Sequence, residues 1–532
     1  MYARSRTAFV ACPSGDPAGT SLDLAAGMTG AGISRRSLIL GAGALALVPA
    51  LTSCGEQTGS TGTLLQSRVP FPKPFTVPFV TPPIARPTQP GGTAYELTAR
   101  TSDVEILPGR TTLVLGYDGS FPGPTIHARG GTATTVRLRN DLPVPTVMHL
   151  HGGVTPSTDD GYPTDLIQPR DTRLRRHLHP GVQARTTVGE RTYTFPLRQR
   201  ASTLWYHDHT MDFTGPNVYA GLAGMFVVHD DEDDALPLPT GARDVPLVIC
   251  DRSFGPDGEL TYPALSTSQK VHGVRDDYMG GVLGDVVLVN GRPWPVMEVD
   301  RARYRFRVLN ASNARRFSLT LDHGARFVQV GTDQGLLPRP VERDSITLAP
   351  AERADVVVDL SQVPVGTKVT MRNGLGSGGT AQVMQLHVVR QGNDDSRIPT
   401  RLSTVEPLRD SDVVATRDLH FALGKPTNGH PHGLWSVNGV TFADGKDVAR
   451  PRLGTVERWR LSSDVHHPVH PHLVRMQYAD EPERGWKDTI DLEPGSAVEV
   501  LVQIEGYRGR YVMHCHNLEH EDMAMMVHFT VV

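Results

Sequence analysis

The sequence predicts an all-β fold built from three tandem β-sandwich domains. Three observations support this prediction. The chain of 532 residues holds 53 glycines and 42 prolines, a density of turn residues that suits many short strands better than long helices. Short runs that alternate apolar and polar residues are frequent, as in half-buried strands, whereas helical periodicity is almost absent over long windows. One turn-and-strand pattern also occurs three times after residue 90.

Each copy of this repeat starts with a turn dipeptide and continues through a loop with proline or glycine into an alternating strand. The turn glycines are Gly119, Gly291 and Gly439, and the strands that follow are expected at 134–140, 304–310 and 456–462. Each copy closes on a similar strand, expected at 225–229, 386–389 and 527–532. The repeat length of about 150 residues is that of an ordinary domain.

Residues 1–54 are expected to direct export and to stand outside the fold. Arg35 and Arg36 form a twin-arginine pair, which is typical of a bacterial export signal. The apolar run 38–51 that follows is too short to cross about 30 Å of hydrocarbon as a helix and resembles the apolar region of a signal peptide. We therefore predict export by the twin-arginine route to an extracytoplasmic location.

Cys54 ends the segment Leu51-Thr52-Ser53-Cys54, which resembles a lipobox. In that interpretation Cys54 is lipidated and becomes the mature N-terminus of a membrane-anchored lipoprotein. The alternative is a plain signal peptide cleaved nearby and a secreted protein. Met28 precedes a far better signal-peptide start than Met1 does, so we also expect translation to begin at Met28.

The remaining boundaries follow from composition. Residues 55–90 are expected to be a small, polar tether that leads into a proline-rich segment of extended backbone, either a spacer or a strap laid across the folded body. Charged, turn-rich stretches then divide the chain into three domains, 91–240, 241–400 and 401–532.

Charge and cysteine content exclude two classes of protein. Lys and Arg total 53 and Asp and Glu total 57, so the net charge of −4 argues against a nucleic-acid-binding protein. Four cysteines cannot form a disulfide framework for a chain of this length. Cys250, in an apolar strand pattern, is expected to be a buried, unreactive thiol.

Four histidine clusters are the candidate metal-binding residues of this sequence. The clusters hold His149 and His151; His207 and His209; His467, His470 and His472; and His514, His516 and His520. In a strand, residues i and i+2 point to the same face about 6–7 Å apart, so each His-x-His pair presents two imidazoles to one side. Four such pairs supply eight imidazoles, more than one metal ion takes, so several ions must share them.

Cys515 lies between two of these histidines and is expected to point to the opposite face of the strand. His467, Cys515, His520 and Met525 then remain as a second ligand set. Two imidazoles, a thiolate and a weak axial thioether are the ligands of a blue-copper site. Zinc competes for His and Cys ligands, but it takes four per ion and leaves the eight-histidine arrangement unexplained. His177, His179, His272, His420, His430 and His432 are expected not to bind metal.

Together these motifs resemble the three-domain multicopper oxidases, and the resemblance includes the middle of the chain. Residues 288–295 (LVNGRPWP) and 348–355 (LAPAERAD) are similar to the second domain of the spore-coat laccase, bilirubin oxidase and phenoxazinone synthase branch. The resemblance implies three cupredoxin-like Greek-key β-sandwich domains, of which the second carries no copper ligand.

The resemblance also implies four copper ions and a role for each matching residue. Type 1 copper would take His467, Cys515 and His520, with Met525 axial. Type 2 copper would take His149 and His470. The type 3 ions would take His151, His207 and His516, and His209, His472 and His514. Asp160 and Glu521 match acids that relay protons near the trinuclear cluster, although each alone would pass for a surface carboxylate.

The implied enzyme is a laccase-like copper oxidoreductase, a monomer that oxidises phenols or aminophenols one electron at a time at type 1 copper and reduces O2 to water. Electrons are expected to enter through an exposed edge of His467. The alternative activity is oxidation of Cu(I) or Mn(II), but 14 methionines with no methionine-rich insertion argue against a Cu(I) oxidase. A non-catalytic scaffold is disfavoured because the full ligand set is present.

Overall fold

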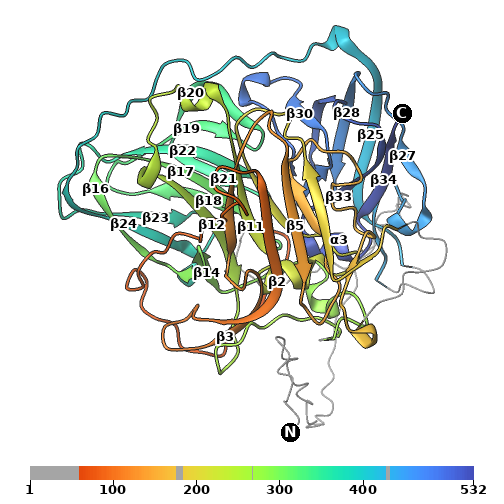
Figure 1. Ribbon diagram of the computed structural model, residues 1–532, viewed down its shortest axis with the longest axis horizontal. Coiled ribbons are helices and arrows are strands. Elements are labelled where there is room, and N and C mark those ends of the chain that lie inside the picture. Colours follow the sequence, from red (N-terminus) through yellow and green to blue (C-terminus); the bar gives the residue numbers. More distant parts are fainter. Residues whose placement is uncertain (1–58, 175–183, 267, 427–431) are drawn as a thin grey trace, which may run out of the picture.

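The computed structural model describes residues 59–532 except 175–183, 267 and 427–431 (Figure 1). The predicted export signal, Cys54, the proposed start at Met28, and His177, His179 and His430 lie outside the described residues. The described chain consists of strands arranged as three two-sheet sandwiches with a few short helices, which confirms the predicted all-β fold. None of the described helices is long and apolar enough to cross a membrane.

The first sandwich consists of sheets with the strand orders β3-β2-β5-β9 and β4-β11-β10-β6. Its strands are β2 (Ala94–Val104), β3 (Thr112–Tyr117), β4 (Gly123–Arg129), β5 (Thr134–Asn140), β6 (Met148–His151), β9 (Glu190–Phe195), β10 (Ser202–Asp208) and β11 (Ala223–His229). The short pair β7 (Ile167–Gln168) and β8 (Thr187–Val188) lies beside them, and the helices are α1 (Thr214–Ala220) and α2 (Asp231–Asp234).

The second sandwich has the orders β15-β14-β12-β17-β22-β19-β20 and β16-β24-β23-β18-β21. Its strands are β12 (Asp244–Arg252), β14 (Val286–Val289), β15 (Arg292–Pro293), β16 (Val296–Arg301), β17 (Arg303–Asn310), β18 (Phe317–Leu321), β19 (Phe327–Thr332), β20 (Gly335–Arg343), β21 (Ser345–Leu348), β22 (Arg353–Asp359), β23 (Lys368–Asn373) and β24 (Gln382–Gln391).

The third sandwich has the orders β26-β25-β28-β32-β30 and β27-β34-β33-β29-β31. Its strands are β25 (Val413–Leu423), β26 (Trp435–Val437), β27 (Asp447–Ala449), β28 (Val456–Ser463), β29 (His467–Pro471), β30 (Arg475–Tyr478), β31 (Ile490–Leu492), β32 (Ala497–Gln503), β33 (Gly509–Cys515) and β34 (Met526–Val531). The helix α3 (Leu518–Asp522) connects β33 to β34.

The repeat in the sequence corresponds to a repeated hydrogen bond. The turn residues Asp118, Asn290 and Asn438 have positive φ values of 53°, 50° and 54°. In each, a side-chain oxygen accepts a hydrogen bond at 2.8 Å from a backbone N–H of the sandwich's first strand, at Thr98, Val248 and His420. Asp and Asn tolerate this backbone conformation and can bond to nearby backbone, which explains the recurring Asp-Gly and Asn-Gly dipeptides.

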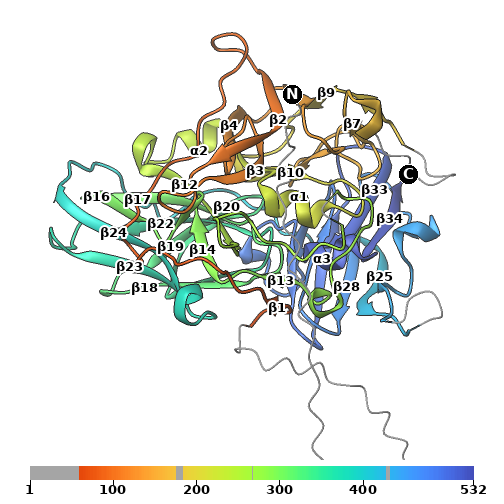
Figure 2. The same cartoon turned by 90° about the horizontal axis from the view of Figure 1, so that it is seen from below.

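The proline-rich segment is a strap across the folded body. β1 (Thr63–Leu64) pairs in parallel with β13 (Val282–Leu283). Further along, the backbone N–H groups of Phe75 and Phe79 donate to the second sandwich, at Trp294 and Val296, and that of Ala85 donates to Thr125 of the first. Of the two interpretations of residues 68–90, the structure therefore shows the strap. Figure 2 shows β1 and β13 at the lower end of the described chain, with α3 above them, and β2 and β4 in the upper part.

One continuous apolar core spans the first two sandwiches, whereas the third sandwich has its own. Cys250 is buried in the first of these cores and Cys515 in the second. The boundary of the third sandwich is therefore a place where polar groups can be buried together without interrupting either core.

Candidate metal centre

Eight histidines meet at the boundary between the first and third sandwiches, and each is at most 1% exposed. The first sandwich contributes His149 and His151 of β6, His207 of β10, and His209 just after it. The third contributes His470 of β29, His514 of β33, and His472 and His516 just beyond these strands. His149 pairs with His207 and His470 with His514 across their strands, so each sandwich presents its imidazoles as one layer.

The two layers are in direct contact. The rings of His149 and His472 are stacked with centroids 3.9 Å apart, and those of His151 and His470 with centroids 3.6 Å apart. Nε2 of His209 lies 3.2 Å from Nε2 of His472 and 3.3 Å from Nε2 of His514. Three ring nitrogens that converge in this way have the spacing of neighbouring ligands on one ion with metal–nitrogen bonds of about 2.0 Å.

Among the described residues, the ring nitrogens that face the centre of the cluster have no hydrogen-bond partners outside it. Their lack of partners indicates whether a metal ion fits there. In the described chain, Nε2 of His149, His207 and His470 and both ring nitrogens of His516 are buried without a hydrogen bond. A buried polar atom without a partner is destabilising by about 1–3 kcal/mol, so a cluster of them indicates a missing ligand. Burial also lowers the pKa of His151, His207, His209, His470, His472 and His516 well below the usual range, and a neutral imidazole is the form that binds metal.

A second group lies on the other face of β33. The sulfur of Cys515 is 3.3 Å from Nδ1 of His467 and 3.7 Å from Nδ1 of His520, and the two Nδ1 atoms are 3.1 Å apart. Met525 is fully buried in the same core, and its backbone bonds to Cys515 and His520. Burial raises the pKa of the Cys515 thiol well above its usual range, so a thiolate there needs a cation beside it. Residues 514–516 thus link the two groups covalently.

Asp160 is a buried contact of the first group. Its Oδ2 lies 2.8 Å from Nδ1 of His472, and its backbone oxygen lies 2.6 Å from Nδ1 of His149. The turn that places it depends on Gly161, where a Cβ would lie 2.2 Å from the backbone oxygen of Met148. Only glycine fits this close approach.

Glu521 is the corresponding acid on α3. Its carboxylate lies 3.1 Å from Nδ1 of His514 and 3.5 Å from Nδ1 of His209, and it accepts a hydrogen bond from Oγ1 of Thr214 at 2.6 Å. Burial alone would raise the pKa of Glu521, but His514, His209 and Thr214 lower it to about 2. Both acids are buried against ring nitrogens, unlike surface carboxylates.

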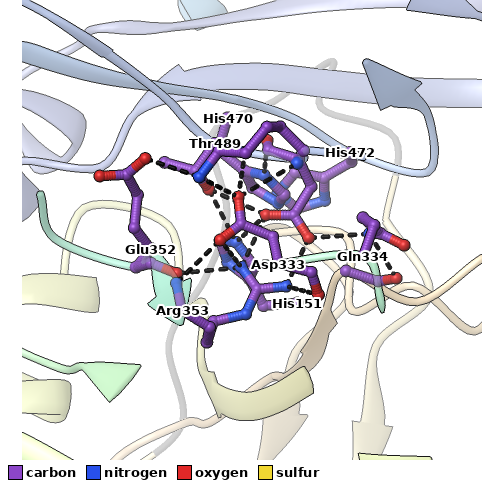
Figure 3. A network of polar contacts seen from close by, with 12 residues as sticks. His151, Asp333, Gln334, Glu352, Arg353, His470, His472 and Thr489 are labelled. Carbon is purple, nitrogen blue, oxygen red and sulfur yellow. Dashed lines mark hydrogen bonds and ion pairs between the residues drawn. The ribbon is translucent and has the colours of Figure 1, made fainter. Parts of the chain in front are cut away.

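A third carboxylate at this site, Asp488, was not predicted from the sequence. Its Oδ1 lies 3.2 Å from Nε2 of His151, and its backbone oxygen lies 2.8 Å from Nδ1 of His470. Arg353 donates two hydrogen bonds to it at 2.7 and 2.5 Å. Asp333, Lys487 and Glu352 continue this buried ionic network across the boundary between the second and third sandwiches (Figure 3). The only indication of this carboxylate in the sequence was the segment of the second domain that contains Arg353. The carboxylate that Arg353 binds lies far along the chain from that segment.

The surroundings of the Cys515 group correct one expectation. His467 is fully buried rather than presenting an exposed edge, because its Nε2 lies 2.8 Å from Oδ1 of Asp464 and Trp435 packs edge-on to its ring. His520 is equally buried, with Trp435 stacked on its ring at 3.8 Å and the backbone oxygen of Gly280 3.2 Å from its Nε2. Asp464, with its side chain 33% exposed, contacts this group and also reaches the surface.

Other histidines lie apart from both groups. Nδ1 of His420 contacts Ser462, His432 pairs with Asp276 at the surface, and His272 is exposed. His466, the neighbour of His467, turns to Arg316 instead.

The chain is similar to several known proteins over most of its length. Family models described as multicopper oxidase match residues 98–233 and 416–532. The chain is 35% identical over 472 residues to a laccase of Bacillus subtilis (strain 168), covering 78% of this chain and 89% of the relative. It is 32% identical to a bilirubin oxidase of Albifimbria verrucaria, covering 86% and 81% of the two chains. The solved laccase of Pediococcus acidilactici superposes with a TM-score of 0.73 at 28% identity, covering 88% of this chain and 95% of that one.

Proposed function

The chain belongs to the multicopper oxidase family and is a copper-dependent oxidoreductase that uses dioxygen, and from this premise we propose that its reducing substrates are phenols and aminophenols, as for a laccase. Four copper ions, one type 1, one type 2 and two type 3, supply one-electron oxidation of the substrate and four-electron reduction of dioxygen to water.

We assign the ligands from the two groups described above. The type 1 ion would be held by His467, Cys515, His520 and Met525, and the type 2 ion by His149 and His470. The type 3 ions would be held by His151, His207 and His516, and by His209, His472 and His514. The support is the mutual approach of these ring nitrogens, their burial, and the absence of other partners for the inward-facing ones within the described chain.

Asp160 and Glu521 would orient the imidazoles and pass on protons that dioxygen reduction consumes. Each carboxylate contacts the outer nitrogen of a histidine whose other nitrogen faces the centre. Reduction of one dioxygen to two waters takes four protons, and a fixed carboxylate within hydrogen-bond reach is suited to pass them inward.

The proposed substrate class is supported mainly by the position of Asp464. Asp464 is partly exposed and hydrogen-bonded to a ring of the Cys515 group, so an incoming phenol can donate its O–H to the same carboxylate. A phenol becomes far easier to oxidise when its proton leaves with the electron, and Asp464 is placed to accept that proton. Two apolar residues lie close to this carboxylate or its ring: Trp435 packs against both imidazoles, and Leu423 donates its backbone N–H to Asp464.

We also propose that the protein is exported by the twin-arginine route and anchored at Cys54. The support is the sequence alone: the paired arginines, the short apolar run and the lipobox-like segment that ends at Cys54.

Oxygen uptake by the copper-loaded protein tests the substrate class. The donors are 2,6-dimethoxyphenol, o-aminophenol, Cu(I) and Mn(II), with Cys515→Ser as the control. Rapid uptake with the two aromatics that is lost in the control is expected. Uptake only with a metal ion would overturn the laccase-like proposal in favour of a metal oxidase.

A further inference from the structure

The first described residues, which precede the strap, lie beside the Cys515 group. Oγ1 of Thr61 accepts a hydrogen bond from the backbone N–H of His466 at 3.1 Å, next to the ligand His467. The backbone oxygen of Gly59 accepts a hydrogen bond at 2.8 Å from Arg316, which also contacts His466. The first described residues are therefore fixed one residue away from a proposed type 1 ligand.

The residues that follow contact the loop 277–281, on the other side of this group. Thr63 donates through its backbone N–H to Gly281 at 2.8 Å and through its hydroxyl to Asp277 at 2.5 Å. Gly280, beside them, offers its backbone oxygen to Nε2 of His520. Residues 59–65 thus contact the neighbours of both proposed type 1 histidines.

Chain length limits how far the proposed anchor can lie from this place. Gly59 is the fifth residue after Cys54. Even fully extended, five residues span at most about 18 Å. A lipid on Cys54 therefore keeps the bilayer surface within about 18 Å of Gly59, whatever path the chain takes between them.

The same end of the molecule exposes large apolar side chains. Leu265 and Val271, which are 54% and 53% exposed, lie in the segment just before the loop held by Thr63. Leu265 and Met523 approach the same point above Gly273, which places this segment against the end of α3. Leu423, 37% exposed, bonds through its backbone to Asp464. Apolar side chains that border an anchor suit a lipid surface better than water.

We propose that the anchor holds the type 1 end of the protein against the membrane, and that its reductant there is a hydroquinone dissolved in the lipid. This inference rests on the anchor and the phenol-oxidising site proposed above. A hydroquinone gives up two single electrons and two protons, one pair at each phenolic oxygen, and becomes a quinone. Two hydroquinones reduce one dioxygen to two waters, so four electrons and four protons balance.

The orientation is tested with single cysteines that carry a fluorophore. Cys250 and Cys515 are buried, so a label reacts with the introduced thiol of Leu265→Cys or Val271→Cys. Ile84→Cys is the matched control, because Ile84 is 62% exposed and pairs with Thr125 of β4, in the upper part of the molecule (Figure 2). The lipidated holoenzyme is placed in phosphatidylcholine vesicles that contain nitroxide-labelled lipid. Quenching at positions 265 and 271 but not at 84 is expected, and equal quenching at all three would overturn the proposal.

The substrate is tested in the same vesicles with decyl-hydroquinone. The comparison is between the anchored enzyme and the chain starting at Gly55, released from a leader with an ordinary cleavage site. The anchored form is expected to oxidise decyl-hydroquinone at least about tenfold faster, because both partners are confined to one surface. Both forms should oxidise 2,6-dimethoxyphenol equally.

Equal rates of the two forms on decyl-hydroquinone, or a mature chain without lipid on Cys54 by mass spectrometry, would overturn the inference. Failure of both forms to oxidise 2,6-dimethoxyphenol would instead contradict the laccase-like proposal. In that case the quenching pattern would still show whether the type 1 end faces the membrane. Failure of the membrane inference can therefore be distinguished from failure of the laccase-like proposal.

Discussion

The ring of His467 connects Asp464 to Cys515: its Nε2 lies 2.8 Å from the carboxylate and its Nδ1 lies 3.3 Å from the sulfur. Because Nδ1 faces the sulfur, Nε2 carries the proton and donates it to Asp464. Burial alone would raise the pKa of Asp464, but the hydrogen bond from His467 and backbone N–H groups lower it. The carboxylate is therefore ionised at neutral pH and makes the imidazole more electron-rich.

Asp464→Asn is expected to raise the type 1 reduction potential. The substitution replaces a charged acceptor by a neutral one, a difference of about 1 kcal/mol in the hydrogen bond, or about 40 mV for a one-electron couple. Redox titration of the blue absorption band measures the shift. Asp447→Asn is the control, since Asp447 bonds to Arg450 and Thr530, away from both groups. A potential that does not rise would show that Asp464 leaves the ring unaffected.

Glu521→Gln is expected to slow reoxidation of the reduced enzyme by O2 about 10- to 100-fold while the blue band is retained. The amide keeps the shape of the side chain but cannot hold a proton for transfer to the centre. Stopped-flow mixing of reduced enzyme with oxygenated buffer measures the rate. Glu519→Gln tests specificity, because Glu519 is an equally buried acid on α3 that instead contacts Tyr262 and Asn313. Unchanged turnover in Glu521→Gln would refute the relay role.

Asp488→Asn is expected to destabilise the copper-free protein by about 3 kcal/mol, because it leaves the buried guanidinium of Arg353 without its bidentate partner. It should also reduce copper retention, since His151 loses the carboxylate beside its Nε2. Urea unfolding and copper analysis after dialysis measure the two effects. The exposed Asp344, which pairs with Arg326, provides the control Asp344→Asn, for which no change is expected. Full copper content in Asp488→Asn would contradict the positioning role.

The pair His127 and His229 predicts a pH dependence of stability. Their ring nitrogens lie 2.9 Å apart, and although His127 is exposed as a whole residue, desolvation of its ring, followed by the neighbouring imidazole, lowers its pKa to about 4 from 6.5. The unfolded chain thus takes up a proton near pH 6.5 that the folded chain resists until about pH 4, so stability is lost as the pH falls through this window.

His127→Gln removes this contribution. The urea midpoint of the copper-free variant should therefore fall less than that of the wild type between neutral pH and pH values within that window. His323→Gln, at an exposed ring, should behave like the wild type. Parallel pH profiles for wild type and His127→Gln would contradict the prediction.

The fold was predictable because its signals are local. Alternation marks strands such as β5 and β17, and the Asp-Gly and Asn-Gly turns recur because these residue types tolerate the positive φ that the turn requires. The His-x-His spacing likewise fixes which side chains share a face. Such features depend on a few consecutive residues, which sequence reasoning handles well.

What escaped prediction depends on contacts between distant segments. Asp488 contacts His151, 337 residues away, and nothing near Asp488 in the sequence indicates it. The burial of His467 follows from Trp435 on another strand and from Asp464, whose acid could equally have pointed to solvent. The helices α1 and α3 were missed because they are seven and five residues long, too short to show periodicity.

Because the metal centre is divided between two sandwiches, its two halves are synthesised at different times. Its proposed ligands lie at 149–209 and 467–525, with the entire second sandwich, from β12 to β24, made in between. At about 5–20 residues per second, synthesis leaves the first four histidines waiting on the order of tens of seconds for the others. During that interval they form an open patch of imidazoles able to capture whatever cation is at hand. We therefore expect correct copper content to depend on keeping the newly made chain from free metal until its last sheet has closed.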